Sequence, residues 1–329
     1  MSDAMHLTKE LAAQIDGFSF ANGHGFVETR IGFAVELFFL GGSESRTRLI
    51  LCDMLRQYHA LFTDALSHFL KLNTSRLTKI TGSDYLDYYE NIARKLSSTE
   101  PMDAMVFGYP GKKVVDEPTP LSISFKCAGP DPMSLLGRSM ICAYFPASFV
   151  AERGYGILFD LTKRWASSVE LLHGSAGYSL LFEHGVFAGS NTVAETVLPP
   201  LKRFPGLDFS DPLHFEVESD LGDGRQIKSI NWLTVINEEI VGKLGGQGAL
   251  AKELGESCPI HGIDGGLIIQ AGSEPQLGDV NRGLVLDDYR RVAKVLEPVR
   301  FNDYRRGLFV LPEPYDKIEE TRRWLRRFE

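Results

Sequence analysis

The chain lacks the features of a membrane-spanning, secreted or disordered protein. No run of about 18 or more uncharged apolar residues occurs, so no transmembrane helix is expected. The N-terminal segment MSDAMHLTKELAAQIDG carries early acidic residues and has no apolar core of a secretory signal. The composition, 43% hydrophobic and 24% charged, is that of an ordinary globular protein. We therefore expect a folded cytoplasmic protein that makes no contact with membranes.

Cysteine is scarce. Cys52, Cys127, Cys142 and Cys258 are widely spaced, and three of them sit inside apolar runs. This pattern predicts buried free thiols in a reducing compartment. Cys258 and His261, at C-P-I-H, have metal-ligand spacing, but one pair is half of the set that structural zinc uses. We expect an ordinary loop cysteine and histidine there, and no metal or cofactor.

Familiar catalytic and nucleotide-binding motifs are also absent. The chain has no GxxxxGK[ST] loop and no H-E-x-x-H, and HGSAG at 173–177 has the wrong spacing for a nucleophile elbow. GDG at 222–224 lacks the third glycine of a dinucleotide fingerprint. The net charge of −8 disfavours direct binding of nucleic acid and fits a basic protein partner, although solubility alone could explain it. We therefore expect a protein that is not an enzyme.

Hydrophobic periodicity predicts an α+β fold with mixed, largely antiparallel sheets and packed helices. Runs rich in aromatic and β-branched residues predict strands. They cover 26–40, 121–127, 138–144, 178–182, 227–236 and 266–271. Apolar residues at three- and four-residue steps predict helices. They cover about 48–69, 84–97, 156–172, 238–244, 247–254, 287–296 and the C-terminal tail.

Glycine and proline cluster between residues 183 and 225, which is where we expect a subdomain boundary. The predicted organisation is an N-terminal segment, an N-terminal α+β subdomain, a connecting segment and a C-terminal α+β subdomain. Their ranges are 1–25, 26–185, 186–225 and 226–329. One continuous domain is the alternative, and a homodimer is a possible assembly.

Two acidic regions are candidate partner-binding surfaces. In the first, Glu216, Glu218 and Asp220 alternate, with Asp223 close behind, so on a strand they would share one face. Three interpretations stay open for this group: a solvated edge, a contact with a protein partner, or a metal or acid–base site.

The second acidic region is the polar face of the helix predicted at 84–97. It carries Asp84, Asp87 and Glu90. Tyr88 is a candidate aromatic anchor for a partner, or alternatively a core residue.

The most ordered pattern in the chain is SINWLTVINEEIVGKLGG at 229–246, followed by IIQAGSEPQLGDVNRG at 268–283. Trp232 fits a core position, Asn231 fits a residue that fixes a backbone turn, and Gly245–Gly246 fits a helix stop. We interpret these segments as scaffold. The scaffold residues are Asn231, Trp232, Leu233, Thr234, Gly245, Gly246, Gln276, Leu277, Gly278 and Asp279.

These segments resemble a bacterial family of type VI secretion immunity proteins, found beside antibacterial toxins with VRR-Nuc or related restriction-endonuclease-like domains. The resemblance is carried by 230–246, 268–283 and YRRVAKVLEPVR at 289–300. RLILCDMLRQYHALF at 48–62, FPAS at 145–148 and WASSVELLHGSAG at 165–177 support it. It implies a cytoplasmic inhibitor that binds and neutralises its cognate nuclease toxin, without catalytic residues of its own.

Two alternatives to an immunity protein stay open. One is a metal-dependent hydrolase using Glu216, Glu218, Asp220 or the 276–282 loop. The other is a structural component of a phage-like or other assembly.

Overall fold

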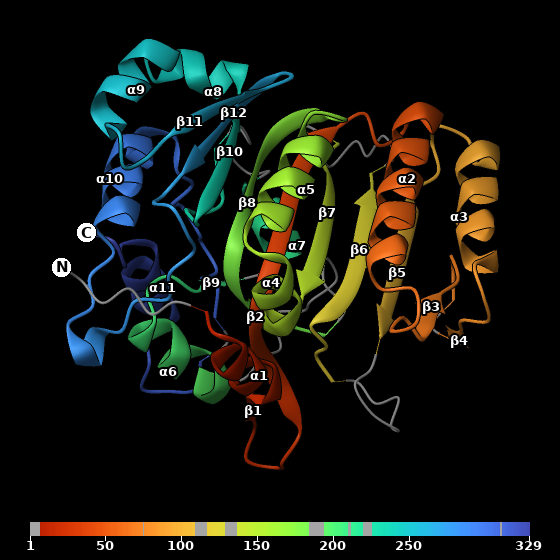
Figure 1. Cartoon of the computed structure of the whole chain (residues 1–329), viewed down its shortest axis with the longest axis horizontal. Coiled ribbons are helices and arrows are strands. Elements are labelled where there is room, and N and C mark those ends of the chain that lie inside the picture. Colours follow the sequence, from red (N-terminus) through yellow and green to blue (C-terminus); the bar gives the residue numbers. More distant parts are fainter. Residues whose placement is uncertain are drawn as a thin grey trace.

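The computed structural model describes residues 7–74, 76–108, 117–128, 137–183, 194–209, 212–219, 226–309 and 311–329. Twelve strands in these ranges form one sheet in the order β11-β12-β10-β8-β2-β7-β6-β5-β3-β4, with β1 on β2 and β9 on β8. Among the strands of the described ranges, every pairing is antiparallel except that of β8 with β9. Helices pack around this sheet (Figure 1). The predicted α+β class, with a largely antiparallel sheet, is confirmed.

The strands are β1 (Ser19–Ala21), β2 (Val27–Leu40), β3 (His68–Leu70), β4 (Leu77–Lys79), β5 (Met102–Gly108), β6 (Leu121–Cys127), β7 (Ser139–Phe145), β8 (Glu170–Leu181), β9 (Asp208–Phe209), β10 (Leu233–Asn237), β11 (Ile260–Ile263) and β12 (Gly266–Gln270). The helices are α1 (Lys9–Gly17), α2 (Ser45–Leu61), α3 (Asp84–Lys95), α4 (Ala147–Arg153), α5 (Gly156–Ala166), α6 (Ala194–Arg203), α7 (Pro212–Ser219), α8 (Glu238–Lys243), α9 (Gln247–Leu254), α10 (Asp287–Leu296) and α11 (Lys317–Leu325), with short 3-10 turns η2 (Val280–Arg282) and η3 (Glu297–Val299).

Strand β2 forms the centre of the sheet, between β7 and β8. Nearly all of its residues are buried, because both of its faces are covered. On one face Phe33 stacks on Tyr178 of β8, with 4.2 Å between ring centroids. On the other face Phe38 meets Phe215 of α7 at 5.2 Å. A strand buried on both faces reads as a continuous apolar run, which is why the sequence predicts it well.

Helix α2 packs its apolar stripe against the sheet, as its periodicity predicts. Leu51, Leu55 and Tyr58 are buried. The hydroxyl of Tyr58 donates to the carbonyl oxygen of Tyr144 on β7 at 2.6 Å. None of the helices in the described ranges combines the length and apolar character that crossing a bilayer requires.

Two predicted helices are too long. The helix expected at about 48–69 ends at Leu61, and Phe69 lies on β3. The helix expected at 156–172 ends at Ala166, and β8 begins at Glu170. The reason is pairing with β2, which runs from Leu40 opposite Glu170 to Arg30 opposite Leu181. These long-range hydrogen bonds draw the end of the expected helix into the sheet.

The sheet continues across the expected subdomain boundary. Strand β10, which follows the 186–225 segment, pairs with β8, which precedes it. The pairs run from Leu233 opposite Ala176 to Ile236 opposite His173. The strand expected at 227–236 is shorter, because residues before Leu233 cross the sheet as irregular chain and are buried there.

That crossing segment places Lys228 inside the protein. Its ammonium lies 2.8 Å from a carboxylate oxygen of Glu36 on β2 and 3.4 Å from one of Asp208 on β9. Ser229 donates to Asp208 at 2.7 Å, and the guanidinium of Arg327 lies 3.9 Å from it. Burial acts to lower the pKa of Lys228, but Asp208 and Glu36 outweigh it and raise the pKa above its ordinary value. The lysine therefore stays charged and joins its own segment to β2 and β9. Arg327 adds the C-terminal end of the chain to this cluster through Asp208.

Lys228→Met should lower the free energy of unfolding by about 3–5 kcal/mol, because it leaves two buried carboxylates without their cation. Lys243→Met is the matched control, since Lys243 pairs with Glu239 on the surface of α8. The control should cost about 0.5 kcal/mol or less. Urea unfolding followed by circular dichroism measures both; equal losses for the two variants would contradict this account.

Candidate functional site

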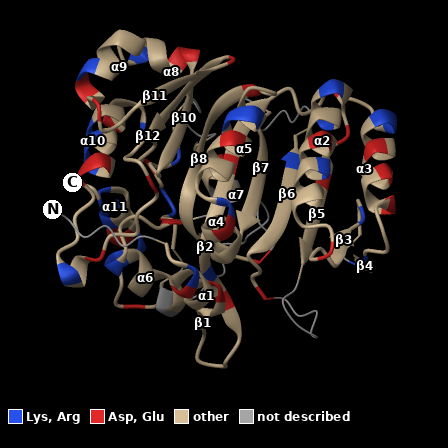
Figure 2. Ribbon diagram, viewed as in Figure 1, with Lys and Arg blue, Asp and Glu red and all other residues tan. Residues whose placement is uncertain are grey.

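Helix α3 presents its acidic side to solvent. Tyr85, Leu86, Tyr89 and Ala93 are buried at helical spacing and fix which side faces outward. Asp84 and Asp87 lie in the first turn, where carboxylates also favour the positive end of the helix dipole. We call Asp84, Asp87 and Glu90 the α3 acidic surface. It lies on the helix at the β3–β4 end of the sheet (Figure 2).

Arginines partly neutralise this surface. Arg56 of α2 lies 3.1 Å from Asp87 and also pairs with Glu90. Arg94 lies 2.6 Å from Glu90. Hydrogen bonds from Arg94 and Arg56 lower the pKa of Glu90. Asp84 has no ion pair with any described residue, so it and the outer part of Asp87 carry the uncompensated charge.

Tyr88 is held half-buried at the edge of the α3 acidic surface. Its hydroxyl accepts a hydrogen bond from the backbone N–H of Leu72 at 2.9 Å. Its ring lies 5.8 Å from that of Phe69 and 5.3 Å from that of Tyr89. The contacts within the protein therefore account for the tyrosine, and only its outer edge is open to a partner.

The interpretation of Glu216 and Glu218 as one face of a solvated strand is wrong. Both lie on helix α7 and are buried. Residues two apart on a helix point in different directions. Accordingly, Glu216 contacts Lys126 at 2.9 Å, while Glu218 accepts from the backbone N–H of Arg305 at 3.0 Å. Asp220 and Asp223 lie outside the described residues.

The other carboxylate of the hydrolase alternative is also engaged inside the protein. Asp279 accepts from the guanidinium of Arg203 at 2.9 Å and from the backbone N–H of Asn281 at 3.0 Å. Within the described ranges, no group of three or more His, Cys, Asp and Glu residues is arranged to hold a metal ion. Glu216, Glu218 and Asp279, on which the hydrolase alternative rested, thus form ion pairs and hydrogen bonds within the protein.

Cys258 and His261 each contact other groups of the protein, and His261 lies on strand β11 where a loop was expected. The Cys258 thiol lies near Asp288, and His261 Nε2 contacts the side-chain oxygen of Gln270 at 3.0 Å. All four cysteines are free and buried, as expected.

The NWLT segment works as scaffold. Asn231 donates to the carbonyl of Tyr178 at 3.1 Å and accepts from the N–H of Trp232 at 2.8 Å. Trp232 is buried and donates to the carbonyl of Gly272 at 3.2 Å. Leu233 and Thr234 are also buried, and the Thr234 hydroxyl donates to the carbonyl of Asn231. These contacts seat β10 on β8.

Gly245 and Gly246 end helix α8. Both have positive φ, 85° and 88°. The N–H of Gly246 donates to the carbonyl of Val241, and that of Gly245 donates to the carbonyl of Gly242. This pair of bonds is the Schellman motif, which needs a left-handed residue that glycine provides.

The QLGD loop is fixed in the same way. Gly278 has φ of 65°, and a Cβ there would lie 3.1 Å from both Pro205 and Leu286. The N–H of Gln276 donates to the hydroxyl of Tyr289 at 3.2 Å. The carbonyl of Leu277 accepts from the N–H of Gly206 at 2.8 Å, which ties the loop to the chain after α6.

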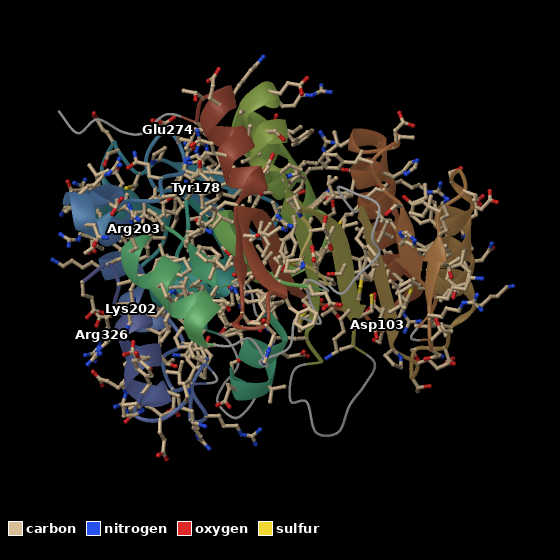
Figure 3. All side chains as sticks on the ribbon, turned by 90° about the horizontal axis from the view of Figure 1, so that it is seen from below. Asp103, Tyr178, Lys202, Arg203, Glu274 and Arg326 are labelled. Carbon is tan, nitrogen blue, oxygen red and sulfur yellow. The ribbon has the colours of Figure 1, made fainter. Side chains whose placement is uncertain are left out.

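Sequence reasoning missed Asp103, which lies opposite Lys126 across β5 and β6 (Figure 3). Burial raises the pKa of Asp103 to about 6, an effect that Lys126 opposes and Glu216 increases. A lone aspartate inside the apolar run MDAMVFG is the signal that could have identified it.

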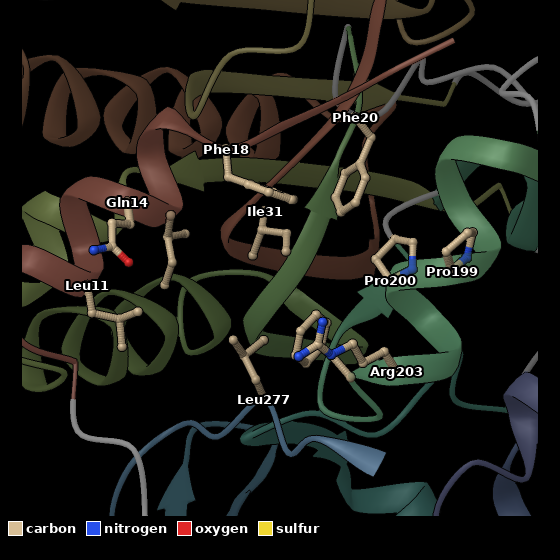
Figure 4. Close-up of a pocket in the computed structure, with 11 residues that line it drawn as sticks. Leu11, Gln14, Phe18, Phe20, Ile31, Pro199, Pro200, Arg203 and Leu277 are labelled. Carbon is tan, nitrogen blue, oxygen red and sulfur yellow. The ribbon is translucent and has the colours of Figure 1, made fainter. Parts of the chain in front are cut away.

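It also missed an apolar groove between α1, β1 and α6, with Leu277 at its side (Figure 4). The groove has a volume of about 380 Å³, within the usual range of ligand and anchor pockets. No sequence motif marks it.

Comparison with known proteins identifies the family. A family model named TsiV, described as type VI immunity for VRR-NUC, matches residues 51–328. The chain belongs to the TsiV family. No curated protein matches the chain. The T6SS protein PA0821 of Pseudomonas aeruginosa is 18% identical, with a TM-score of 0.77 over 97% of this chain and 89% of that chain. At that identity the likeness shows a shared fold.

The TsiV match confirms the resemblance seen in the sequence. It extends from within α2 to beyond α11, and it includes the NWLT and QLGD segments. The scaffold residues described above therefore lie in the matched part of the chain, as does the α3 acidic surface.

The pKa of Asp103 predicts a pH dependence of stability. Its folded value of about 6 lies above the unfolded value of about 3.9, so its stabilising contribution is complete below pH about 4. That contribution is lost as pH rises through 6. Between pH 4.5 and pH 7, the free energy of unfolding of the wild type should therefore fall by about 1–2 kcal/mol relative to that of Asp103→Asn. Urea unfolding at both pH values tests this. The exposed Asp84→Asn should keep the wild-type profile, and an Asp103→Asn profile identical to wild type would refute the assignment.

Proposed function

We propose that this protein binds and neutralises a VRR-NUC nuclease toxin delivered by a type VI secretion system. The observation that carries the proposal is the TsiV family match over residues 51–328. The protein acts in the cytoplasm as a stoichiometric inhibitor and catalyses no reaction itself. The described carboxylates considered for catalysis support this, because Glu216, Glu218 and Asp279 are engaged in contacts inside the protein.

Electrostatics supports a mode of inhibition. A nuclease must present a basic surface to the phosphates of its substrate. A protein with a net charge of −8 is attracted to such a surface, and opposite potentials accelerate encounter. Occupying the basic surface excludes DNA without any change in the toxin's own catalytic residues.

The α3 acidic surface is the proposed contact with that basic surface. Asp84 is unpaired within the described residues, and Asp87 has 71% of its side chain exposed. Both lie at the start of a helix that tyrosines and α2 hold rigidly, so little conformational freedom is lost on binding. Glu216 and Glu218 do not belong to this contact, because they are buried.

Charge reversal tests the contact. Asp84→Lys combined with Asp87→Lys should weaken toxin binding at least 10-fold, mainly through slower association, when measured by surface plasmon resonance at physiological salt. Glu238→Lys with Glu239→Lys is the matched control, because these are also exposed first-turn acids, on α8. The control should change affinity less than 3-fold. Equal effects from the two pairs would show that total charge, and not the α3 acidic surface, governs binding.

The function itself is tested in cells. Co-expression of the protein with the VRR-NUC toxin encoded beside it should restore growth, and the two should co-purify. Continued killing together with a failure to co-purify would refute the proposed function.

A further inference from the structure

The groove between α1, β1 and α6 is lined almost wholly by apolar side chains. Its apolar lining includes Leu11 and Ile15 of α1, Phe18, Phe20 of β1, Phe204 and Leu277. Figure 4 shows Leu11, Phe18, Phe20 and Leu277 around it. Gln14 and Arg203 are the polar residues on its lining. An apolar groove on a monomer marks a place where a partner can bury surface.

One aromatic ring of the lining is open to solvent. Phe18 is 51% exposed, although its ring packs edge-on against Phe20 at 4.9 Å. The groove therefore presents an aromatic side chain that a partner can cover.

Positive charge is in excess at one side of the groove. Arg203 lies on its lining and pairs with Asp279, which also pairs with Arg282. The carboxylate is 8% exposed against 45% and 67% for the two arginines. One buried carboxylate therefore serves two exposed cations, in a chain of net charge −8.

We propose that this groove binds a second segment of the VRR-NUC toxin, in which one or two apolar side chains are flanked by acidic residues. This inference rests on the proposed function. The apolar lining selects the anchor, and the exposed cations of Arg203 and Arg282 select the flanking acids. The segment lies outside the toxin's basic DNA-binding surface, because that surface would be repelled by the same cations.

A second copy of this chain fits the groove less well. A two-fold symmetric dimer through this face would bring Arg203 and Arg282 of each copy toward the same cations of its partner. Such like-charge contacts oppose association.

Two contacts of opposite polarity make toxin binding selective. The α3 acidic surface lies at the β3–β4 end of the sheet, away from α1 and α6 (Figure 1), whose residues line the groove. A toxin must match both to bind fully. A basic nuclease without the apolar, acidic segment engages the α3 acidic surface alone and binds weakly.

Filling the groove tests the proposal. Gln14→Trp places a large ring over the groove from an exposed position on α1, and Ala13→Trp adds the same ring at the neighbouring exposed position outside the lining. We expect Gln14→Trp to weaken binding of catalytically inactive toxin at least 30-fold in isothermal titration calorimetry. Ala13→Trp should stay within 3-fold of wild type, and both variants should keep the wild-type melting temperature.

Removing the outer arginine tests the charge requirement. Arg282→Gln should weaken toxin binding about 3- to 10-fold and reduce its salt dependence, while Lys252→Gln on the exposed side of α9 should stay within 2-fold. If Gln14→Trp binds the toxin with the same affinity as the wild type, this inference is overturned and the proposed function stays intact. No binding by the wild type would instead refute the proposed function. A wild-type dimer in sedimentation that Gln14→Trp dissociates, with toxin affinity unchanged, would assign the groove to a second copy and overturn the inference.

Discussion

The burial of one lysine is the constraint on which the rest of the structure depends. Lys228 lies between Glu36, on the central strand β2, and Asp208, on a two-residue strand beside β8. An unpaired charge in such a place costs several kcal/mol, so the three groups are stable only together. Their contact fixes the irregular segment before β10 on the sheet. It thereby lets β10, β12 and β11 continue the sheet built by the N-terminal part of the chain. Arg327 extends the same network to the C-terminal end of the chain.

Charge is distributed in two different ways at the surface. On α3 the carboxylates point outward and only partly find arginine partners. Beside the groove the carboxylate of Asp279 is buried, and its partners Arg203 and Arg282 are exposed. Net charge alone describes neither arrangement, because ion pairs that share a buried member expose charge of one sign. A partner that uses both surfaces is discriminated by pattern more than by total charge.

The parts of the fold that follow local rules could be predicted from the sequence. The apolar run of β2, the heptad-like stripe of α2 and the double-glycine stop of α8 each have a local physical cause. Residues 215–219 could not be predicted, because alternating acids suggest a strand while the helix is held by distant groups. Phe215 packs on Phe38, and Ser219 accepts from Arg138 at 2.7 Å. The groove could not be predicted for a related reason. Leu11 and Pro200 are far apart in the sequence and line the same groove only in the folded chain.

The central claim is that this TsiV-family protein inhibits a nuclease by binding it. The most direct measurement is DNA cleavage by the purified VRR-NUC toxin encoded beside its gene, titrated with this protein at a toxin concentration well above the dissociation constant. We expect cleavage to fall linearly and to reach zero near one equivalent of this protein. Added DNA should compete with this protein for the toxin and restore part of the cleavage. Undiminished cleavage at a large excess of this protein would contradict the claim.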